Sequence, residues 1–263
     1  MIIGTGLFLQ LLEKDPEFYL AHFQHIEIQD FVLPDNIDYY SRDIIKNYKN
    51  ILKEFQGSLS LHAPFKELTP GSMDSMVRGL VEKRFSAALD FAGELGCNTM
   101  VVHSCYNTLM DYPGYDDNWL ENCSLFWDRF LPKSEDTGIT VVLENIWDKT
   151  PAHIVKLLNT FDSIYFKACL DTGHANIFSP YPLEHWVDVL GESLVHAHVH
   201  DNHGKEDEHL TVGKGSINFN GLIPAKNSFT VTMVNEAFGT LEDEKAFIKY
   251  INQRLGEKDI VSK

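Results

Sequence analysis

Apolar and polar positions alternate along the chain with two periods. Short runs rich in β-branched, leucine and aromatic residues predict strands, and several are almost continuously apolar, as in parallel strands covered on both faces. Longer segments between them place apolar residues at i, i+3 and i+4, which predicts amphipathic helices. The eight predicted strands are residues 2–4, 26–29, 58–62, 99–103, 140–144, 166–171, 195–200 and 231–236.

Predicted helices fill most of the intervals between these strands. The clearest is 75–95, whose apolar stripe includes Val81, Ala88 and Ala92 and which Gly96 ends at the C-terminal cap. Residues 202–228 differ, because this segment is long, polar and glycine-containing where a helix would be expected. The other predicted helices are residues 11–23, 41–55, 118–136, 152–160, 182–190 and 242–254.

The strand count favours a closed barrel. Eight strand–helix units in 263 residues average about 33 residues each, the length of a compact unit with its loops. An open doubly wound sheet shares the alternation, but the first strand is not followed by a GxGxxG motif. No linker rich in proline, glycine or serine interrupts the pattern. We therefore predict an α/β fold, a single-domain (β/α)8 TIM barrel over residues 1–263.

Composition narrows the possible partners. With 44% hydrophobic residues the chain can bury a large core, and 38 acidic against 22 basic residues give a net charge of −16. This charge disfavours a broad surface for nucleic acid. The four cysteines lack CxxC spacing, so we expect them to be reduced and packed. No apolar run is long enough to span a membrane, and residues 1–4 lack signal-peptide features, so we expect a cytoplasmic protein. The sequence is compatible with a homo-oligomer.

Histidine and acidic residues recur where the predicted strands end. Twelve histidines are present, five of them between residues 196 and 209. The candidate residues at or near the ends of strands three to eight lie 27 to 41 residues apart, about one strand–helix unit each. A barrel would gather them at its C-terminal mouth, where such enzymes place their chemistry. They are His62, His103, Glu144, Asp171, His198 and Glu236.

This pattern points to a metal. One carboxylate at a strand end can cap a helix or pair with a lysine, but six ligand-type residues at equivalent positions favour ligation. Burying several carboxylates without cations costs several kcal/mol, which a divalent ion offsets. Mixed imidazole and carboxylate ligands favour zinc or manganese, with cobalt, iron or magnesium as further options. His174, Asp207 and His209 are additional candidate ligands.

Several motifs together resemble the xylose isomerase-like TIM barrel superfamily over about residues 58–238. That superfamily contains sugar and sugar-phosphate isomerases and epimerases, together with abasic-site nucleases of the endonuclease IV type. The motifs are His62-Ala63-Pro64-Phe65, Leu143-Glu144-Asn145, Leu170-Asp171-Thr172-Gly173-His174, His198-Val199-His200-Asp201, and Asp207-Glu208-His209-Leu210 followed by Gly213-Lys214-Gly215.

The resemblance implies two alternative metal centres. In the isomerase branch one divalent ion would be held by the residues matching Glu144, Asp171, His198 and Glu236. In the nuclease branch the centre would be enlarged to three zinc ions. His62 and His103 would then join Glu144 at one ion, and His174, Asp207 and His209 would hold another.

We predict a divalent-metal-dependent sugar or sugar-phosphate isomerase or epimerase that abstracts a proton and forms a metal-stabilised enediolate. Glu144 and Glu236 would act as base and acid, unless they serve only as ligands, and His174 would move a proton between substrate oxygens. The alternative is an endonuclease IV-like trinuclear-zinc phosphodiesterase acting on abasic DNA, and a third is a non-catalytic metal- or sugar-binding barrel. Two features favour a sugar substrate over DNA. The chain is acidic, and it has Phe65 at a position where the nuclease motif commonly has tyrosine.

Further residues have weaker signals. Gly213-Lys214-Gly215 could approach a phosphate through backbone N–H groups and the Lys214 side chain. His196 is expected to be a hydrogen-bonded residue of the barrel interior, and His200 to contact a ligand residue. The acidic stretch 27–30 bears only a faint similarity to the family. Six aromatic residues could form an apolar rim around a sugar or pack in the core: Phe65, Tyr106, Trp119, Trp147, Phe178 and Phe238.

Overall fold

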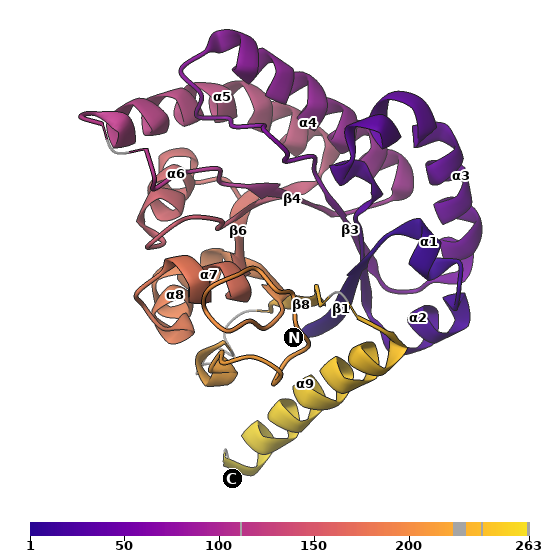
Figure 1. Ribbon diagram of the computed structural model, residues 1–263. Coiled ribbons are helices and arrows are strands. Elements are labelled where there is room, and N and C mark those ends of the chain that lie inside the picture. Colours follow the sequence, from indigo (N-terminus) through magenta and orange to yellow (C-terminus); the bar gives the residue numbers. More distant parts are fainter. Residues whose placement is uncertain (111, 223–229, 238, 262–263) are drawn as a thin grey trace.

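Eight parallel strands close into a barrel in sequence order, with β8 paired back to β1. The structure is a computed structural model that describes residues 1–110, 112–222, 230–237 and 239–261. Figure 1 shows the strands at the centre and the helices around them. The predicted (β/α)8 TIM barrel is therefore confirmed. The strands are β1 (Ile2–Leu7), β2 (His25–Ile28), β3 (Ser58–His62), β4 (Thr99–His103), β5 (Thr140–Glu144), β6 (Phe166–Asp171), β7 (Leu194–Val199) and β8 (Thr232–Asn235).

The helices alternate with the strands as predicted. Among the described residues, none of these helices is long and apolar enough to cross a membrane. The α-helices are α1 (Leu9–Leu12), α2 (Pro16–His22), α3 (Ser41–Ile51), α4 (Ser75–Leu95), α5 (Tyr115–Thr137), α6 (Ala152–Phe161), α7 (Thr172–Phe178), α8 (Leu183–Leu190) and α9 (Leu241–Val261). The short helical turns are η1 (Asp30–Val32), η2 (Asn36–Tyr40), η3 (Leu52–Glu54), η4 (Gly191–Ser193) and η5 (Phe219–Gly221).

Local capping explains where the helix predictions hold and where they do not. Helix α4 has its predicted bounds because Asp74 caps its start and Gly96, at φ 77°, ends it. The single helix predicted over 11–23 is wrong. Asp15 accepts a hydrogen bond from the backbone N–H of Phe18, and Pro16 occupies the first helical position, so a new helix begins there.

The main apolar core lies between the barrel and the helices. Inside the barrel, Val101, Val142 and Cys169 form a small separate cluster. Strand register places Val101 beside Val142 and His103 beside Glu144, so these side chains share the inner face. Along β4 and β5 the inner face is therefore apolar at Val101 and Val142 and carries His103 and Glu144 at the C-terminal ends of the strands.

Helix α9 is tied to the seam between β1 and β8 by a buried carboxylate. Glu244 accepts hydrogen bonds of 2.9 Å from the Thr5 hydroxyl and from the Asn235 side-chain amide. Thr5 and Asn235 are themselves partners across the seam. Because the side chain is only 9% exposed, burial raises the pKa of Glu244 to about 7.

Replacing Glu244 with glutamine should therefore stabilise the protein at alkaline pH. The folded-state pKa lies above the unfolded one, so the stability contribution is present below pH 4.5 and is lost as pH rises to about 7. A neutral amide avoids that loss, which corresponds to about 3 kcal/mol. Urea unfolding of both proteins should show little difference at pH 4.5 and a more stable Glu244→Gln variant at pH 8. Equal stability at pH 8 would contradict this explanation.

Candidate functional site

The C-terminal ends of the strands form one mouth of the barrel, and all nine predicted ligand residues lie there. They are His62, His103 and Glu144 at the ends of β3, β4 and β5, Asp171 at the end of β6, His174 in α7, His198 in β7, Asp207 and His209 in the loop after β7, and Glu236 directly after β8. Residues up to 174 positions apart in sequence therefore meet in one place, as the regular spacing predicted.

Glu144 is at the centre of this group. Its Oε2 atom lies 3.3 Å from Nε2 of His62 and 3.4 Å from Nε2 of His103. Nδ1 of His198 is 3.4 Å from the same oxygen, and Nδ1 of His174 is 3.4 Å from Oε1. The Glu144 carboxylate is 1% exposed, so imidazole groups surround it in place of water.

A second part of the mouth is built around the start of α7, a helix that the sequence pattern did not predict. Asp171 caps this helix by accepting a 2.6 Å hydrogen bond from the backbone N–H of His174. The His174 ring consequently lies between two carboxylates, with Nδ1 3.3 Å from Asp171 Oδ1 and Nε2 3.4 Å from Asp207 Oδ2. Nε2 of His209 lies 3.1 Å from the same Asp207 oxygen.

Glu236 completes the mouth on the side of β1 and β2. Its Oε2 atom lies 3.1 Å from Nδ1 of His198, and the side-chain amide of Gln29 donates a hydrogen bond to Oε1. A Cβ atom at position 6 would lie 2.6 Å from Gln29 Nε2, so glycine is needed for Gln29 to reach Glu236. The backbone carbonyl of Glu236 accepts a 2.7 Å hydrogen bond from His209 Nδ1.

The donor set fits a divalent cation. Glu144 Oε2 and both ring nitrogens of His198 are buried, yet none makes a regular hydrogen bond with a described residue. An unpaired buried polar atom costs about 1–3 kcal/mol. An ion among Glu144, Asp171, His198 and Glu236 would satisfy Glu144 Oε2 and Nδ1 of His198, which faces both glutamates. Zinc and manganese accept such ligands. Three-residue groupings here include His62, Glu144 and His198, and Glu144, Asp171 and His174.

Opposite charges shift the pKa values of the site. Burial opposes the charged form of His209, but its hydrogen bond to Asp207 and the Glu236 charge raise its pKa to about 9. Burial likewise opposes charge on His174 and His198, yet neighbouring acids hold both pKa values well above the usual range. Burial raises the pKa of Glu236. In the absence of an ion, protonated histidines therefore balance the carboxylates.

Four further residues support the site; His200 was expected to do so from the sequence, while Asn145, Gln29 and Glu27 were not. Asn145 fixes the end of β6, since its side chain donates to Asp171 O and accepts from Asp171 N. Nε2 of His200 lies 3.1 Å from Asp171 Oδ2, while Gln29 contacts Glu236 and Glu27 lies beneath His198. The signal available for the last two was the alternation of polar residues at the end of the second strand.

A cavity of about 920 Å³ opens above the mouth. Phe65, Trp147 and Phe178 of the predicted aromatic rim line it. Trp119 does not line this cavity; it is buried and faces an adjacent cavity of about 510 Å³, while Tyr106 packs on His153 with ring centroids 3.9 Å apart. Phe238 lies outside the described residues. The site is therefore wide, polar at its base and apolar at its walls.

The predicted phosphate contact through the backbone N–H groups of residues 213–215 is wrong. The backbone N–H groups of Gly213 and Gly215 each donate a 2.9 Å hydrogen bond to Asp201 Oδ2. These groups are thus already used to fold the loop after β7, and an anion there would meet the Asp201 carboxylate. By contrast, His196 is a hydrogen-bonded residue of the barrel interior, as expected.

Comparison with known proteins agrees with this architecture. A family model described as a xylose isomerase-like TIM barrel matches residues 21–232. The uncharacterized protein MJ1311 of Methanocaldococcus jannaschii is 27% identical, over 93% of this chain and 89% of that protein.

Two solved structures are similar over nearly their whole length. One, described as a D-tagatose 3-epimerase-like protein, is 26% identical with a TM-score of 0.75, covering 97% of this chain and 100% of its own. The other is the TTHB071 protein from Thermus thermophilus, soaked with zinc chloride. It is 24% identical with a TM-score of 0.80, covering 98% of this chain and 99% of its own, and shows likeness in fold.

Proposed function

The chain belongs to the xylose isomerase-like TIM barrel family, and from this premise we propose that it is a metal-dependent isomerase or epimerase of a sugar or sugar phosphate. The observation that carries the proposal is the convergence of Glu144, Asp171, His198 and Glu236 beneath a wide cavity. The similarity to an epimerase-like protein over nearly the full chain supports it.

The four converging residues would hold the ion. A divalent metal bound there would polarise substrate oxygens and stabilise the negative charge that develops when a proton leaves the adjacent carbon. Zinc or manganese suits the mixed donor set, with cobalt, iron or magnesium as further options.

The chain's own carboxylates would carry the proton transfer. The His198 ring lies within 3.4 Å of both Glu144 and Glu236, so the two carboxylates reach the same point from different strands. One would accept the proton and the other would return it to the opposite face. Burial raises the pKa of Glu236, which suits a group that must hold a proton during turnover. His174 would move a proton between substrate oxygens, and His62, His103 and His209 would contact hydroxyl or phosphate groups.

A specific observation supports a second candidate, phosphoester hydrolysis at three zinc ions. His62 and His103 approach Glu144, while His174 and His209 approach Asp207, so ligand-type residues extend beyond one four-residue centre. The net charge of −16 would repel DNA, which keeps this candidate second. A non-catalytic metal- or sugar-binding barrel is the third alternative.

Counting ions and following proton exchange separates these candidates. We expect protein purified without chelator to hold one divalent ion per chain, located by anomalous scattering. We also expect it to exchange solvent deuterium into a ketose at the carbon beside the carbonyl. Three bound ions, with incision of abasic DNA and no sugar exchange, would favour the hydrolase, and a chain that binds no metal under any loading condition would exclude both.

A further inference from the structure

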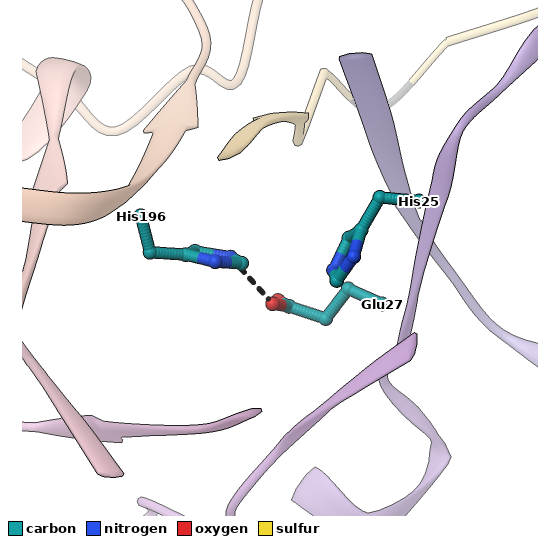
Figure 2. Close-up of side chains that lie close together, drawn as sticks. All are labelled: His25, Glu27 and His196. Carbon is teal, nitrogen blue, oxygen red and sulfur yellow. Dashed lines mark hydrogen bonds and ion pairs between the residues drawn. The ribbon is translucent and has the colours of Figure 1, made fainter. Parts of the chain in front are cut away.

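A second layer of polar side chains lies inside the barrel beneath the mouth. Figure 2 shows His25 and Glu27 projecting from one side of the interior toward His196 on the other. His25 and Glu27 belong to β2, and His196 to β7. All three are buried, at 2%, 0% and 2% exposure, so their contacts are with protein groups.

Glu27 is the centre of this layer. Its Oε2 atom accepts a 2.8 Å hydrogen bond from the Ser60 hydroxyl and lies 3.0 Å from Nε2 of His196. Its other oxygen, Oε1, lies 3.0 Å from Nε2 of His198. The carboxylate therefore contacts the side of the His198 ring that is opposite Nδ1, the atom that faces Glu144 and Glu236.

His25 supports Glu27 from below. Its two ring nitrogens lie 2.7 Å from the Ser58 hydroxyl and 2.8 Å from the Ser60 hydroxyl. Because Ser60 gives its proton to Glu27, it must accept one from His25, which leaves Nδ1 to accept from Ser58. Gly4 makes room for this side chain, since a Cβ atom at position 4 would lie 3.0 Å from both Cβ and Cδ2 of His25.

These contacts argue against a separate metal site in the layer. The three residues are close enough to bind an ion. However, both His25 nitrogens, one oxygen of Glu27 and Nε2 of His196 already have hydrogen-bond partners. The remaining oxygen of Glu27 faces His198. The layer therefore holds the Glu27 carboxylate in place against one histidine of the mouth, His198.

We propose that Glu27 is a positioning residue for His198. Its Oε1 atom and Nε2 of His198 lie 3.0 Å apart without a regular hydrogen bond, and they form one when an ion binds Nδ1, so that Nδ1 stays directed at the ion-binding centre. A carboxylate behind a ligating histidine fixes the tautomer and ring orientation and makes the ligand more basic. The inference rests on the metal-binding part of the proposed function. It does not depend on which substrate the protein uses.

Glu27→Gln tests the inference, with Glu244→Gln as the matched control. Both replace a buried glutamate with its isosteric amide, but Glu244 lies between α9 and the β1–β8 seam. Zinc affinity, measured by competition with a chromophoric chelator, should fall about 10- to 100-fold in Glu27→Gln. It should remain unchanged in Glu244→Gln. The visible spectrum of the cobalt form should keep the wild-type coordination number, because no ligand is removed.

Three results would overturn the proposal. They are unchanged zinc affinity in folded Glu27→Gln, an equal loss in Glu244→Gln, and a cobalt spectrum showing that a ligand has been lost, which would make Glu27 itself a ligand. If Glu27→Gln does not fold, the wild-type cobalt protein decides. Its His198 N–H resonance should be paramagnetically shifted and exchange slowly with D₂O, and rapid exchange would contradict the contact with Glu27.

The same measurements separate this inference from the proposed function. A wild-type protein that binds zinc but exchanges no proton with any sugar would contradict the isomerase proposal, while the Glu27→Gln comparison would still test positioning. Conversely, sugar exchange together with unchanged zinc affinity in Glu27→Gln would support the isomerase and reject the role of Glu27.

Discussion

Replacing Glu236 with glutamine should reduce proton exchange into the substrate by about 10³-fold while the metal stays bound. Glutamine keeps a neutral oxygen at this position, and Glu144, Asp171 and His198 remain as ligands. What is lost is the ability to exchange a proton with the substrate, which the isomerase proposal assigns to Glu144 and Glu236 together. Deuterium incorporation per metal-containing chain, followed by NMR, measures the effect directly.

Glu208→Gln is the matched control for this experiment. Glu208 lies in the loop after β7, between Asp207 and His209, but its carboxylate pairs with exposed His203 at 2.9 Å rather than with a residue of the mouth. Its exchange rate should equal that of the wild type. Should Glu236→Gln retain both metal and full exchange, Glu236 would be a ligand only, and it would have no part in the proton transfer.

Removing the metal should make stability strongly pH-dependent. Without the ion, protonated histidines balance the buried carboxylates, and the pKa of His209 is raised to about 9. The folded-state pKa of His209 lies above its unfolded value. Protonated His209 therefore contributes fully to the free energy of unfolding below pH 6.5, and this contribution is lost as pH rises through 9. His209 alone accounts for about 3 kcal/mol of this loss. His174 and His198, whose pKa values are also raised, add to it.

Metal-loaded protein should not show that loss, because the positive ion takes over the charge balance. It replaces the proton on its ligand His198, and its charge lowers the pKa values of the nearby His174 and His209. Urea unfolding of chelator-treated and zinc-loaded protein should therefore give midpoints that separate progressively between pH 7 and 9. Glu244, whose pKa is raised to about 7, titrates in the chelator-treated and the zinc-loaded protein alike, so its contribution cancels in the difference between the two midpoints. A chelator-treated protein with constant stability across the window would show that the histidines do not carry this charge balance.

The sequence by itself determined the barrel and the location of the candidate site. Apolar runs of strand length, separated by helical patterns of similar size, specify repeated units whose strands must run parallel. His62, His103, Glu144 and Asp171 each end a strand of such a unit. In a closed parallel barrel all strand ends point to the same mouth, so regular spacing along the chain becomes proximity in space.

Which atoms face each other was decided only by the tertiary structure. Glu27 and Gln29 have the same alternating pattern as other strand residues, but barrel closure brings Glu27 beneath His198 and Gln29 against Glu236. Residues 213–215 looked available for an anion until the loop fold brought Asp201 against their N–H groups. Side-chain contacts between strands depend on barrel register and loop path. These follow from packing over the whole chain, which no local pattern of residues encodes.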